Sequence, residues 1–251
     1  MFLIVGAGIV VCFQVGKAPP VLPVIMEDLK MSLFSAGWIL SSFNITGLIL
    51  GSFIGALSDT FGHRRMLLWG LVCQTVGSFL GSLSPNASVL LGTRVMEGLG
   101  FFMMAVSGPS LILQVTRTED LRLALSIWSC WLPTGTAIIM FIMPAITAYF
   151  GWRGLWLVNA GILAGYALWM GTSSKGLRSG LRERKTSMRR LWWDIGITST
   201  SKGPVLLAIT FSTFTLQWLA VVGFLPTLLI ESYGTTPEKA SILTGLIAVS
   251  Y

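Results

Sequence analysis

Residues 89–115 read VLLGTRVMEGLGFFMMAVSGPSLILQV, and this stretch decides the class of fold. At a rise of about 1.5 Å per residue, a helix of this length spans the hydrocarbon core of a bilayer, which is about 30 Å thick. The stretch lacks the alternation of apolar and polar residues that marks a membrane β-strand. Because a backbone in lipid must satisfy its own hydrogen bonds, the stretch predicts a transmembrane helix.

The whole chain shares this character. It is 53% hydrophobic and only 11% charged, with a mean hydropathy of +0.77, whereas soluble domains carry about 25% charged residues. We therefore predict an all-α membrane protein. The expected spanning segments are 2–25, 34–57, 66–83, 88–115, 123–149, 154–171 and 204–230, with an eighth that begins near residue 240.

The eighth segment stops at Tyr251. About twelve helical residues reach only about 18 Å, which is too short to cross a bilayer. We therefore expect either that the chain is a fragment or a truncated product, or that its end needs a partner.

The positive charge of the chain is distributed by side. Twelve of the seventeen Lys and Arg lie in the links after the second, fourth and sixth segments, and the opposite side holds only Lys30, Arg153 and Lys239. Because cytoplasmic loops are rich in Lys and Arg, we predict that the N-terminus and the basic links are cytoplasmic. The net charge of +7 then reports topology, and no nucleic-acid partner is expected.

The longest link divides the chain. We predict an N-terminal six-helix bundle over 1–171, a basic cytoplasmic linker over 172–203, and the first one and a half helices of a second bundle over 204–251. Trp192 and Trp193 follow basic residues in the linker. This pattern suits a helix on an anionic inner leaflet, and equally a solvated linker.

Residues 55–65, GALSDTFGHRR, form the short link after the second segment. Gly55 ends a face of small residues, and Gly62 permits a tight turn with positive φ. Asp59 with Arg64 and Arg65 can form a charge latch, meaning an ion pair that holds one conformation and breaks in another. The alternative is a link whose arginines only fix the topology.

This link resembles a motif of the major facilitator superfamily, G-x-x-x-D-(R/K)-x-G-(R/K)-(R/K). The matching residues are Gly55, Asp59, Gly62 and Arg64, whereas Thr60 and His63 replace residues that are usually basic. Two further stretches resemble family signatures. RVMEGLG at 94–100 is similar to R-x-x-Q-G-x-G, and GWR stands at 151–153.

The resemblance implies two six-helix bundles with a substrate site between them, which rock to give alternating access. This chain would supply the first bundle, complete, and the start of the second. It would act as a secondary transporter in the inner (plasma) membrane, with a small-molecule substrate and a proton as the possible coupling ion. The rest of the second bundle would be its partner in cis.

Arg94 and Glu97 lie three residues apart inside the fourth segment, so they share one helix face and can pair. Charges inside a membrane are costly, so they indicate function. With Gly98, they are our candidates for proton coupling or for a bundle interface, as the resemblance implies. The alternative is a structural ion pair.

Lys17 lies in the first segment among Gly16, Pro19, Pro20 and Pro23. Proline breaks helical hydrogen bonding, and a cation at a broken helix suits an anion site. Gln14, one turn earlier, could add a donor. We therefore predict a substrate site for a small anion at Lys17 and Gln14. The alternative is a lysine that extends to the outer headgroups.

Pro133 and Gly135 predict a helix break in the fifth segment. The glycines there are out of step with the pattern of the drug/proton antiporters of the superfamily, and the first segment carries no acid inside the membrane. Both points favour an anion over a cationic drug. The stretches WLPTG, GKAPP and GWRGLW resemble the cyanate-transporter-like branch. A drug/proton efflux pump and a truncated, non-transporting sensor stay as alternatives.

An enzyme is not expected. The single histidine, His63, lies in a link, so it cannot build a catalytic or metal-binding group within the membrane. We predict no cofactor and no metal site.

Overall fold

The computed structural model describes residues 1–173 and 188–250, and it is helical throughout apart from short links. The helices are α1 (Phe2–Gly16), η1 (Pro19–Val21), α2 (Leu22–Asp28), α3 (Leu33–Phe61), α4 (His63–Ser82), α5 (Ala87–Val115), η2 (Thr118–Asp120), α6 (Leu121–Ser129), α7 (Trp131–Ser173), α8 (Met188–Thr200), α9 (Lys202–Tyr233) and α10 (Pro237–Ser250). Every expected spanning segment coincides with one of these helices or with a pair of them. The all-helical prediction is therefore confirmed.

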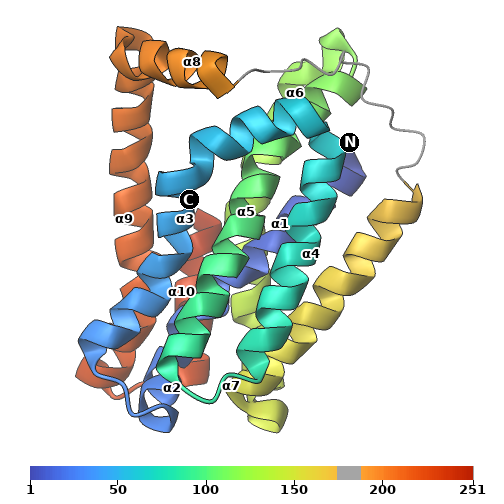
Figure 1. The fold of residues 1–251 in the computed structure, drawn as a ribbon. Coiled ribbons are helices and arrows are strands. Elements are labelled where there is room, and N and C mark those ends of the chain that lie inside the picture. The colour runs from blue at the N-terminus through green and yellow to red at the C-terminus, as the bar shows by residue number, and fades with distance from the viewer. Residues whose placement is uncertain (174–187, 251) are drawn as a thin grey trace.

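The helices run up and down between two ends (Figure 1). One end, called the linker end, holds Met1, the turn between α3 and α4, and α8. The other, called the far end, holds α2 and the link between α4 and α5. The helix α5 packs against α3 and α4, α1 packs against α7, and α10 packs against α7 and α9.

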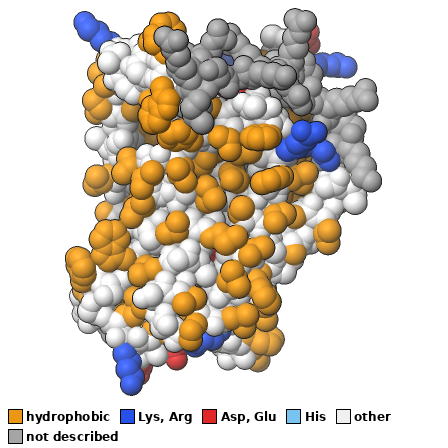
Figure 2. Space-filling view, viewed as in Figure 1, with side chains coloured by type: hydrophobic (Ala, Val, Ile, Leu, Met, Phe, Trp, Pro, Cys, Tyr) orange, Lys and Arg blue, Asp and Glu red, His pale blue; other side chains and the backbone are white. Residues whose placement is uncertain are grey.

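Five stretches are long and apolar enough to cross a membrane among the described residues: Phe2–Asp28, Leu33–Phe61, Ala87–Val115, Thr118–Ser173 and Lys202–Tyr233. At 56 residues, Thr118–Ser173 has the length of two crossings. Figure 2 shows hydrophobic side chains over the middle of the visible face, with Lys and Arg toward the two ends. This distribution is that of a surface that faces lipid.

Two helices are interrupted close to where the sequence predicts. The first segment ends as α1 at Gly16 and resumes as η1 at Pro19 and as α2 at Leu22. The fifth segment breaks at Cys130, between α6 and α7. The break therefore lies before Pro133 and Gly135, and not at these two residues as the sequence predicts. The reason is that Pro133 lies in the first turn of α7, where a missing N–H costs nothing.

Gly135 instead permits close packing of α7 against α1. A Cβ atom built on it would contact the backbone oxygen of Ile9 in α1. Gly77 and Gly81 likewise lie against Glu97 and Trp156.

Several other glycines of the membrane helices make no such close contact. Apart from the neighbouring backbone of the same helix, no described atom lies within 4 Å of the position that a Cβ atom would take on Gly161, Gly165 or Gly51. These glycines therefore mark no close contact between helices in the described part of the chain.

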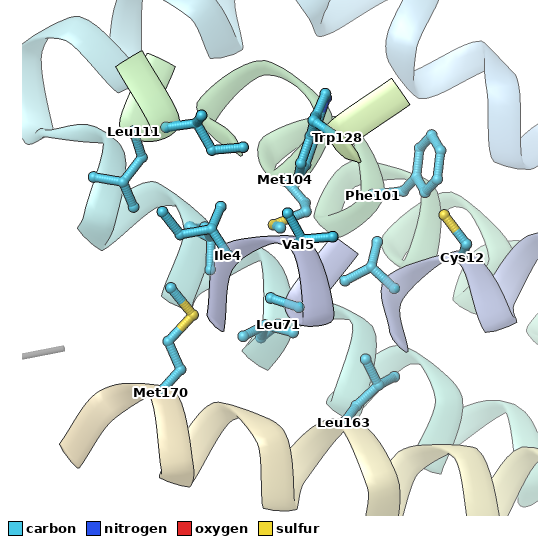
Figure 3. Packing of buried hydrophobic residues seen from close by; sticks show 14 of the residues in the cluster. Ile4, Val5, Cys12, Leu71, Phe101, Met104, Leu111, Trp128, Leu163 and Met170 are labelled. Carbon is cyan, nitrogen blue, oxygen red and sulfur yellow. The ribbon is translucent and has the colours of Figure 1, made fainter. Parts of the chain in front are cut away.

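The hydrophobic core nearest the linker end surrounds α1 (Figure 3). Ile4, Val5 and Cys12 of α1 pack with Leu71 of α4 and Met104 of α5. This packing fixes α1 between α5 and α7, and so it fixes the depth at which the polar residues after Cys12 lie.

A buried charge cluster beside an aromatic cavity

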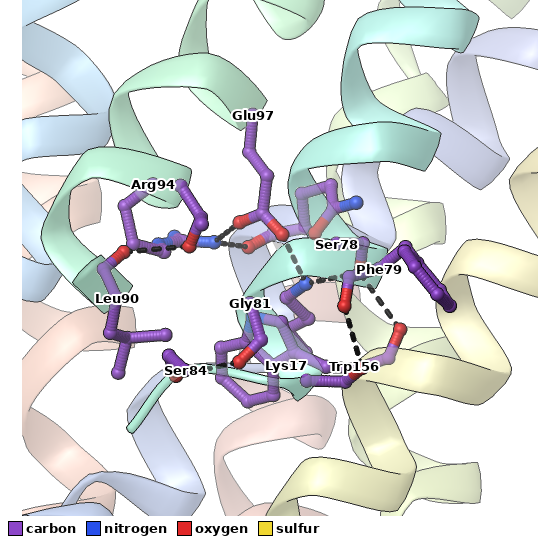
Figure 4. A network of polar contacts seen from close by, with 12 residues as sticks. Lys17, Ser78, Phe79, Gly81, Ser84, Leu90, Arg94, Glu97 and Trp156 are labelled. Atoms are coloured by element: carbon purple, nitrogen blue, oxygen red, sulfur yellow. Dashed lines mark hydrogen bonds and ion pairs between the residues drawn. The ribbon is translucent and has the colours of Figure 1, made fainter. Parts of the chain in front are cut away.

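Lys17 and Glu97 form an ion pair inside the bundle (Figure 4). The ammonium Nζ lies 2.7 Å from Glu97 Oε1, and both side chains are completely buried. The same ammonium donates to Ser78 Oγ at 2.8 Å and lies 4.2 Å from the ring centroid of Trp156. Ser78 in turn donates to the carbonyl of Trp156. Three helices, α1, α4 and α5, and the second half of α7 therefore meet at one lysine.

Arg94 approaches Glu97 from the other side. Its Nη1 lies 2.5 Å from Glu97 Oε2. It also donates to two backbone carbonyls, from Nε to Ile39 at 3.1 Å and from Nη1 to Gln14 at 3.1 Å. Its guanidinium lies 4.7 Å from the ring centroid of Phe43. The predicted pairing of Arg94 with Glu97 is confirmed as geometry, and its role in coupling stays a prediction.

The glycines of α4 and α5 make this contact possible. The Cβ position of Gly77 is 2.9 Å from Glu97 Cγ, and that of Gly81 is 2.6 Å from Trp156 Cδ1. A Cβ atom on Gly98 would collide with the backbone oxygen of Phe43. Small residues on neighbouring membrane helices let backbones approach closely, and here that approach brings the charges together.

The cluster carries one excess positive charge, because two cations share one carboxylate. Buried charges are tolerated only when they are paired and hydrogen-bonded. Gln74 and Asn159 lie buried on the same helices as Ser78 and Trp156, and their side-chain amides have no hydrogen-bond partner in the described part of the chain. The middle of the bundle is therefore a polar layer.

The two residues of the predicted anion site make contacts within the protein, and their role in substrate binding stays a prediction. Lys17 does not face an open cavity, because Glu97 and Ser78 enclose its ammonium. Gln14 contributes its backbone carbonyl to Arg94, and its buried side-chain amide makes no hydrogen bond to described residues. The sequence could not show that Lys17 and Glu97, 80 positions apart, would meet.

A cavity of about 640 Å³ lies between the first bundle and α9. Val15, Asn44 and Leu132 line it together with a set of aromatic side chains. These are Phe43, Phe101, Phe102, Trp128, Trp131, Phe211, Phe214 and Trp218. Among the described residues that line the cavity, none is charged.

Part of the cavity wall is a continuous aromatic stack. The rings of Trp128 and Trp131 are 4.8 Å apart at 15°, and those of Trp131 and Phe101 are 5.4 Å apart at 22°. Phe43 continues the row at 5.2 Å from Phe101. Gly108 makes room for Trp128, because a Cβ atom there would meet its ring.

A smaller pocket, of about 240 Å³, lies beside the cavity and beside the charge cluster. Phe43, Asn44 and Trp218 line both spaces, and Arg94 lines the smaller one. The aromatic cavity and the charge cluster are therefore neighbours, with the smaller pocket that Arg94 lines between them. From the sequence alone, these aromatic residues are expected to face lipid or to pack. Only the fold shows which of them share a wall of the cavity.

The turn at 55–65 has the predicted backbone. Gly62 has φ 88°, and Asp59 is 65% exposed in its side chain, with Oδ1 3.8 Å from His63 Nε2. His63 is buried and contacts Ser58 Oγ at 2.6 Å through Nδ1. Burial lowers the pKa of His63, and the nearby Asp59 opposes this shift.

The other predicted residues of this turn are Arg64, Arg65 and Gly55. Arg64 donates from Nη2 to the carbonyl of Gly171 at 3.2 Å, and Arg65 is exposed. A Cβ atom on Gly55 would lie 4.0 Å from Val106. The role of this turn as a charge latch stays a prediction.

Comparison with known proteins identifies the family. The family model described as Major Facilitator Superfamily matches residues 4–251. The chain belongs to this superfamily, a family of transporters and not of enzymes. Its fold matches a bacterial homologue of the human lysosomal transporter Spinster, in an inward-facing and unoccupied conformation, with a TM-score of 0.81 at 14% identity. That match covers 99% of this chain and 58% of the other. The xylose transporter XylE from E. coli matches with a TM-score of 0.70 at 14% identity, over 99% of this chain and 65% of the other.

Curated relatives are similar over part of this chain. The multidrug efflux pump LfrA of Mycolicibacterium smegmatis is 33% identical over 143 residues, which is 57% of this chain and 28% of LfrA. The riboflavin transporter RibZ of Clostridioides difficile is 26% identical over 57% of this chain and 32% of RibZ. The quinolone resistance protein NorA of Staphylococcus aureus is 32% identical over 38% of this chain and 25% of NorA. The chain therefore spans about a third or less of the length of these relatives.

Proposed function

We propose that this superfamily member exports an aromatic organic molecule by alternating access. The cavity that eight aromatic side chains line is the observation that carries this proposal. Several relatives whose names include efflux, export or resistance support the direction of transport.

The size and chemistry of the cavity indicate the class of substrate. Its volume of about 640 Å³ lies within the range of about 300–1,000 Å³ that is typical of sites for small organic ligands. Flat aromatic walls favour planar rings, because stacked pairs contribute about 0.5–1.5 kcal/mol beyond the burial of area. Trp131, stacked between Trp128 and Phe101, is the central residue of this wall.

The charges near the cavity favour a neutral or anionic substrate. No carboxylate is among the described residues that line the cavity, and the charged residue among those that line the neighbouring smaller pocket is Arg94. A cation would leave water without a counter-ion, which is unfavourable. In this proposal the ring system lies against the aromatic stack, and any acidic group points toward Arg94.

The remaining elements have roles in the cycle. The cluster of Lys17, Glu97 and Arg94 couples the substrate site to a proton, and the turn at Asp59 is the latch of the linker end. The basic links and the N-terminus face the cytoplasm, in accord with the side on which Lys and Arg gather. The units 1–171, 172–203 and 204–251 are the first bundle, the linker and the beginning of the second bundle.

Transport of a small anion, as in the cyanate-transporter-like branch, is the second candidate. The position of Arg94 in the smaller pocket supports it. The ion pair of Lys17 with Glu97 weakens it, because a neutralised ammonium attracts an anion less strongly.

Binding and transport of two probes test these candidates. Riboflavin is a neutral planar aromatic whose fluorescence falls on stacking, and labelled cyanate represents the small anions. We expect purified protein to quench riboflavin, and proteoliposomes to transport it in exchange for protons when a proton gradient is imposed. Quenching should weaken in Trp131→Ala and persist in Trp169→Ala, which alters an exposed tryptophan of α7. Cyanate transport without riboflavin binding would favour the second candidate, and equal quenching by both variants would refute the aromatic site.

A further inference from the structure

The turn at 61–64, Phe-Gly-His-Arg, is repeated as Phe-Gly-Trp-Arg at 150–153. Each glycine has a positive φ, 88° at Gly62 and 64° at Gly151. Each turn joins two antiparallel helical runs, α3 to α4 at the linker end and the two halves of α7 at the far end. The two turns therefore occupy equivalent places at opposite ends of the bundle.

The two arginines make reciprocal hydrogen bonds. Arg64, at the start of α4, donates to the carbonyl of Gly171 near the end of α7, at 3.2 Å. Arg153, at the start of the second half of α7, donates to the carbonyl of Ser84 just after α4, also at 3.2 Å. A cation near a helix C-terminus satisfies free carbonyls and is favoured by the helix dipole. Each turn thus links the start of one helical run to the end of the other, between α4 and α7, by a hydrogen bond from its arginine.

The turns differ in how they engage an acid. At the far end, Asp28 Oδ2 lies 2.5 Å from Arg153 Nη1 and accepts from Trp152 Nε1 at 3.1 Å. Arg153 also lies 4.3 Å from the ring centroid of Trp152. At the linker end, the carboxylate of Asp59 is mostly exposed and lies 3.8 Å from His63. Within the described ranges, the acid of the far turn is thus held by an arginine and an indole, whereas Asp59 has only a distant imidazole.

This difference between the two turns matches a difference in packing between the two ends of the molecule. At the far end α10 lies against α7, where Ser241 donates to the carbonyl of Met140 at 2.6 Å. Gly151 and Trp152 face Pro237 and Glu238 across a small pocket there. The aromatic cavity lies apart from this small pocket, because Trp128 and Ser129, in the last turn of α6, are among the residues that line the cavity. The engaged turn is at the end where the second unit is packed against the first.

We infer that Asp28 and Arg153 are positioning residues of the transport cycle and form a second latch, at the far end. The latch is engaged while that end is closed and is released when it opens, whereas the turn at Asp59 engages in the opposite state. This inference rests on the proposed function only in needing alternating access, and it is independent of the substrate.

Spin-label distances test the second latch in the reconstituted protein. One label pair replaces Lys30 and Lys239 at the far end, and another replaces Arg117 and Thr200 at the linker end. We expect Asp28→Asn and Arg153→Gln to raise the population with a long far-end distance about two- to fivefold, as loss of a partly exposed ion pair allows. Asp59→Asn should lower that population.

A neighbouring acid and a charge exchange serve as controls. Glu27→Gln removes an acid one residue before Asp28 and should leave both distances unchanged. The double variant Asp28→Arg with Arg153→Asp should restore the parental distribution, which a loss of folding would not do.

The outcomes separate this inference from the proposed function. If Asp28→Asn behaves like Glu27→Gln, or shifts the distances in the same direction as Asp59→Asn, the second latch is refuted even where riboflavin is transported. Shifts in the expected directions in a protein that binds no riboflavin would support the latch and refute the aromatic substrate.

Discussion

The ammonium of Lys17 lies 2.7 Å from Glu97 Oε1, and the guanidinium of Arg94 lies 2.5 Å from the other oxygen of the same carboxylate. One acid therefore serves two buried cations. Where the resembling family motif has a neutral glutamine, this chain has Glu97, and Lys17 supplies the additional positive charge.

Removal of the acid should cost more than removal of the lysine. Glu97→Gln leaves Lys17 and Arg94 buried without a counter-ion, whereas Lys17→Met leaves a neutral Arg94–Glu97 pair. Breaking a buried pair costs about 3–5 kcal/mol, so we expect that loss for Glu97→Gln and a smaller one for Lys17→Met. Thermal unfolding in detergent measures both.

The exposed Lys202→Met is the matched control for removing a lysine. Equal melting temperatures for Glu97→Gln and Lys17→Met would contradict the sharing of one carboxylate by two cations.

Trp131 should determine the affinity for a planar ligand. Its ring is stacked between Trp128 and Phe101, and stacking contributes about 0.5–1.5 kcal/mol. We expect Trp131→Ala to weaken riboflavin binding about tenfold and Trp131→Phe to weaken it by less. Fluorescence titration gives both constants, and identical constants for the two variants would show that the ring does not contribute.

Gly135 and Gly161 should respond in opposite ways to alanine. A Cβ atom at Gly135 collides with the backbone oxygen of Ile9, whereas the same atom at Gly161 meets no described atom within 4 Å. Overpacking costs about 1–3 kcal/mol, and alanine is the better helix former by about 1 kcal/mol. Gly135→Ala should therefore lower the melting temperature, and Gly161→Ala should keep or raise it. A stable Gly135→Ala protein would contradict the close approach of α1 and α7.

His63 should make the folded protein sensitive to mild acid. Its pKa is lowered by burial, although Asp59 opposes the shift, and the other groups packed on it are the hydroxyls of Ser58 and, through it, Ser107. As the pH falls below about 6.5, the unfolded chain takes up the proton before the folded one does. Stability should then decrease from about pH 7.5 to about pH 5.5.

The variant His63→Gln isolates this effect, because His63 is the single histidine of the chain. Its melting temperature should change less over the same pH range. Parallel curves for the parent and the variant would show that His63 does not titrate in this way.

Much of the fold could be predicted from local patterns. The apolar runs located the membrane helices, and Pro19 and Pro20 located the break after α1. Gly62 correctly indicated a turn with positive φ. The motif around Arg94 and Glu97 indicated an ion pair, because three residues along a helix return to the same face. These features depend on the periodicity of the helix and on the conformations open to glycine and proline.

What the sequence by itself determined is therefore the set of helices, their order and the local pair of Arg94 with Glu97. The tertiary structure decided that Lys17 meets that pair, that Trp128, Trp131 and Phe101 share one wall, and that Asp28 reaches Arg153 across 125 positions. Hydrophobicity and helical period repeat every few residues, so they are written in any short stretch. A contact between distant side chains depends on how the helices pack, and that depends on all of their surfaces at once.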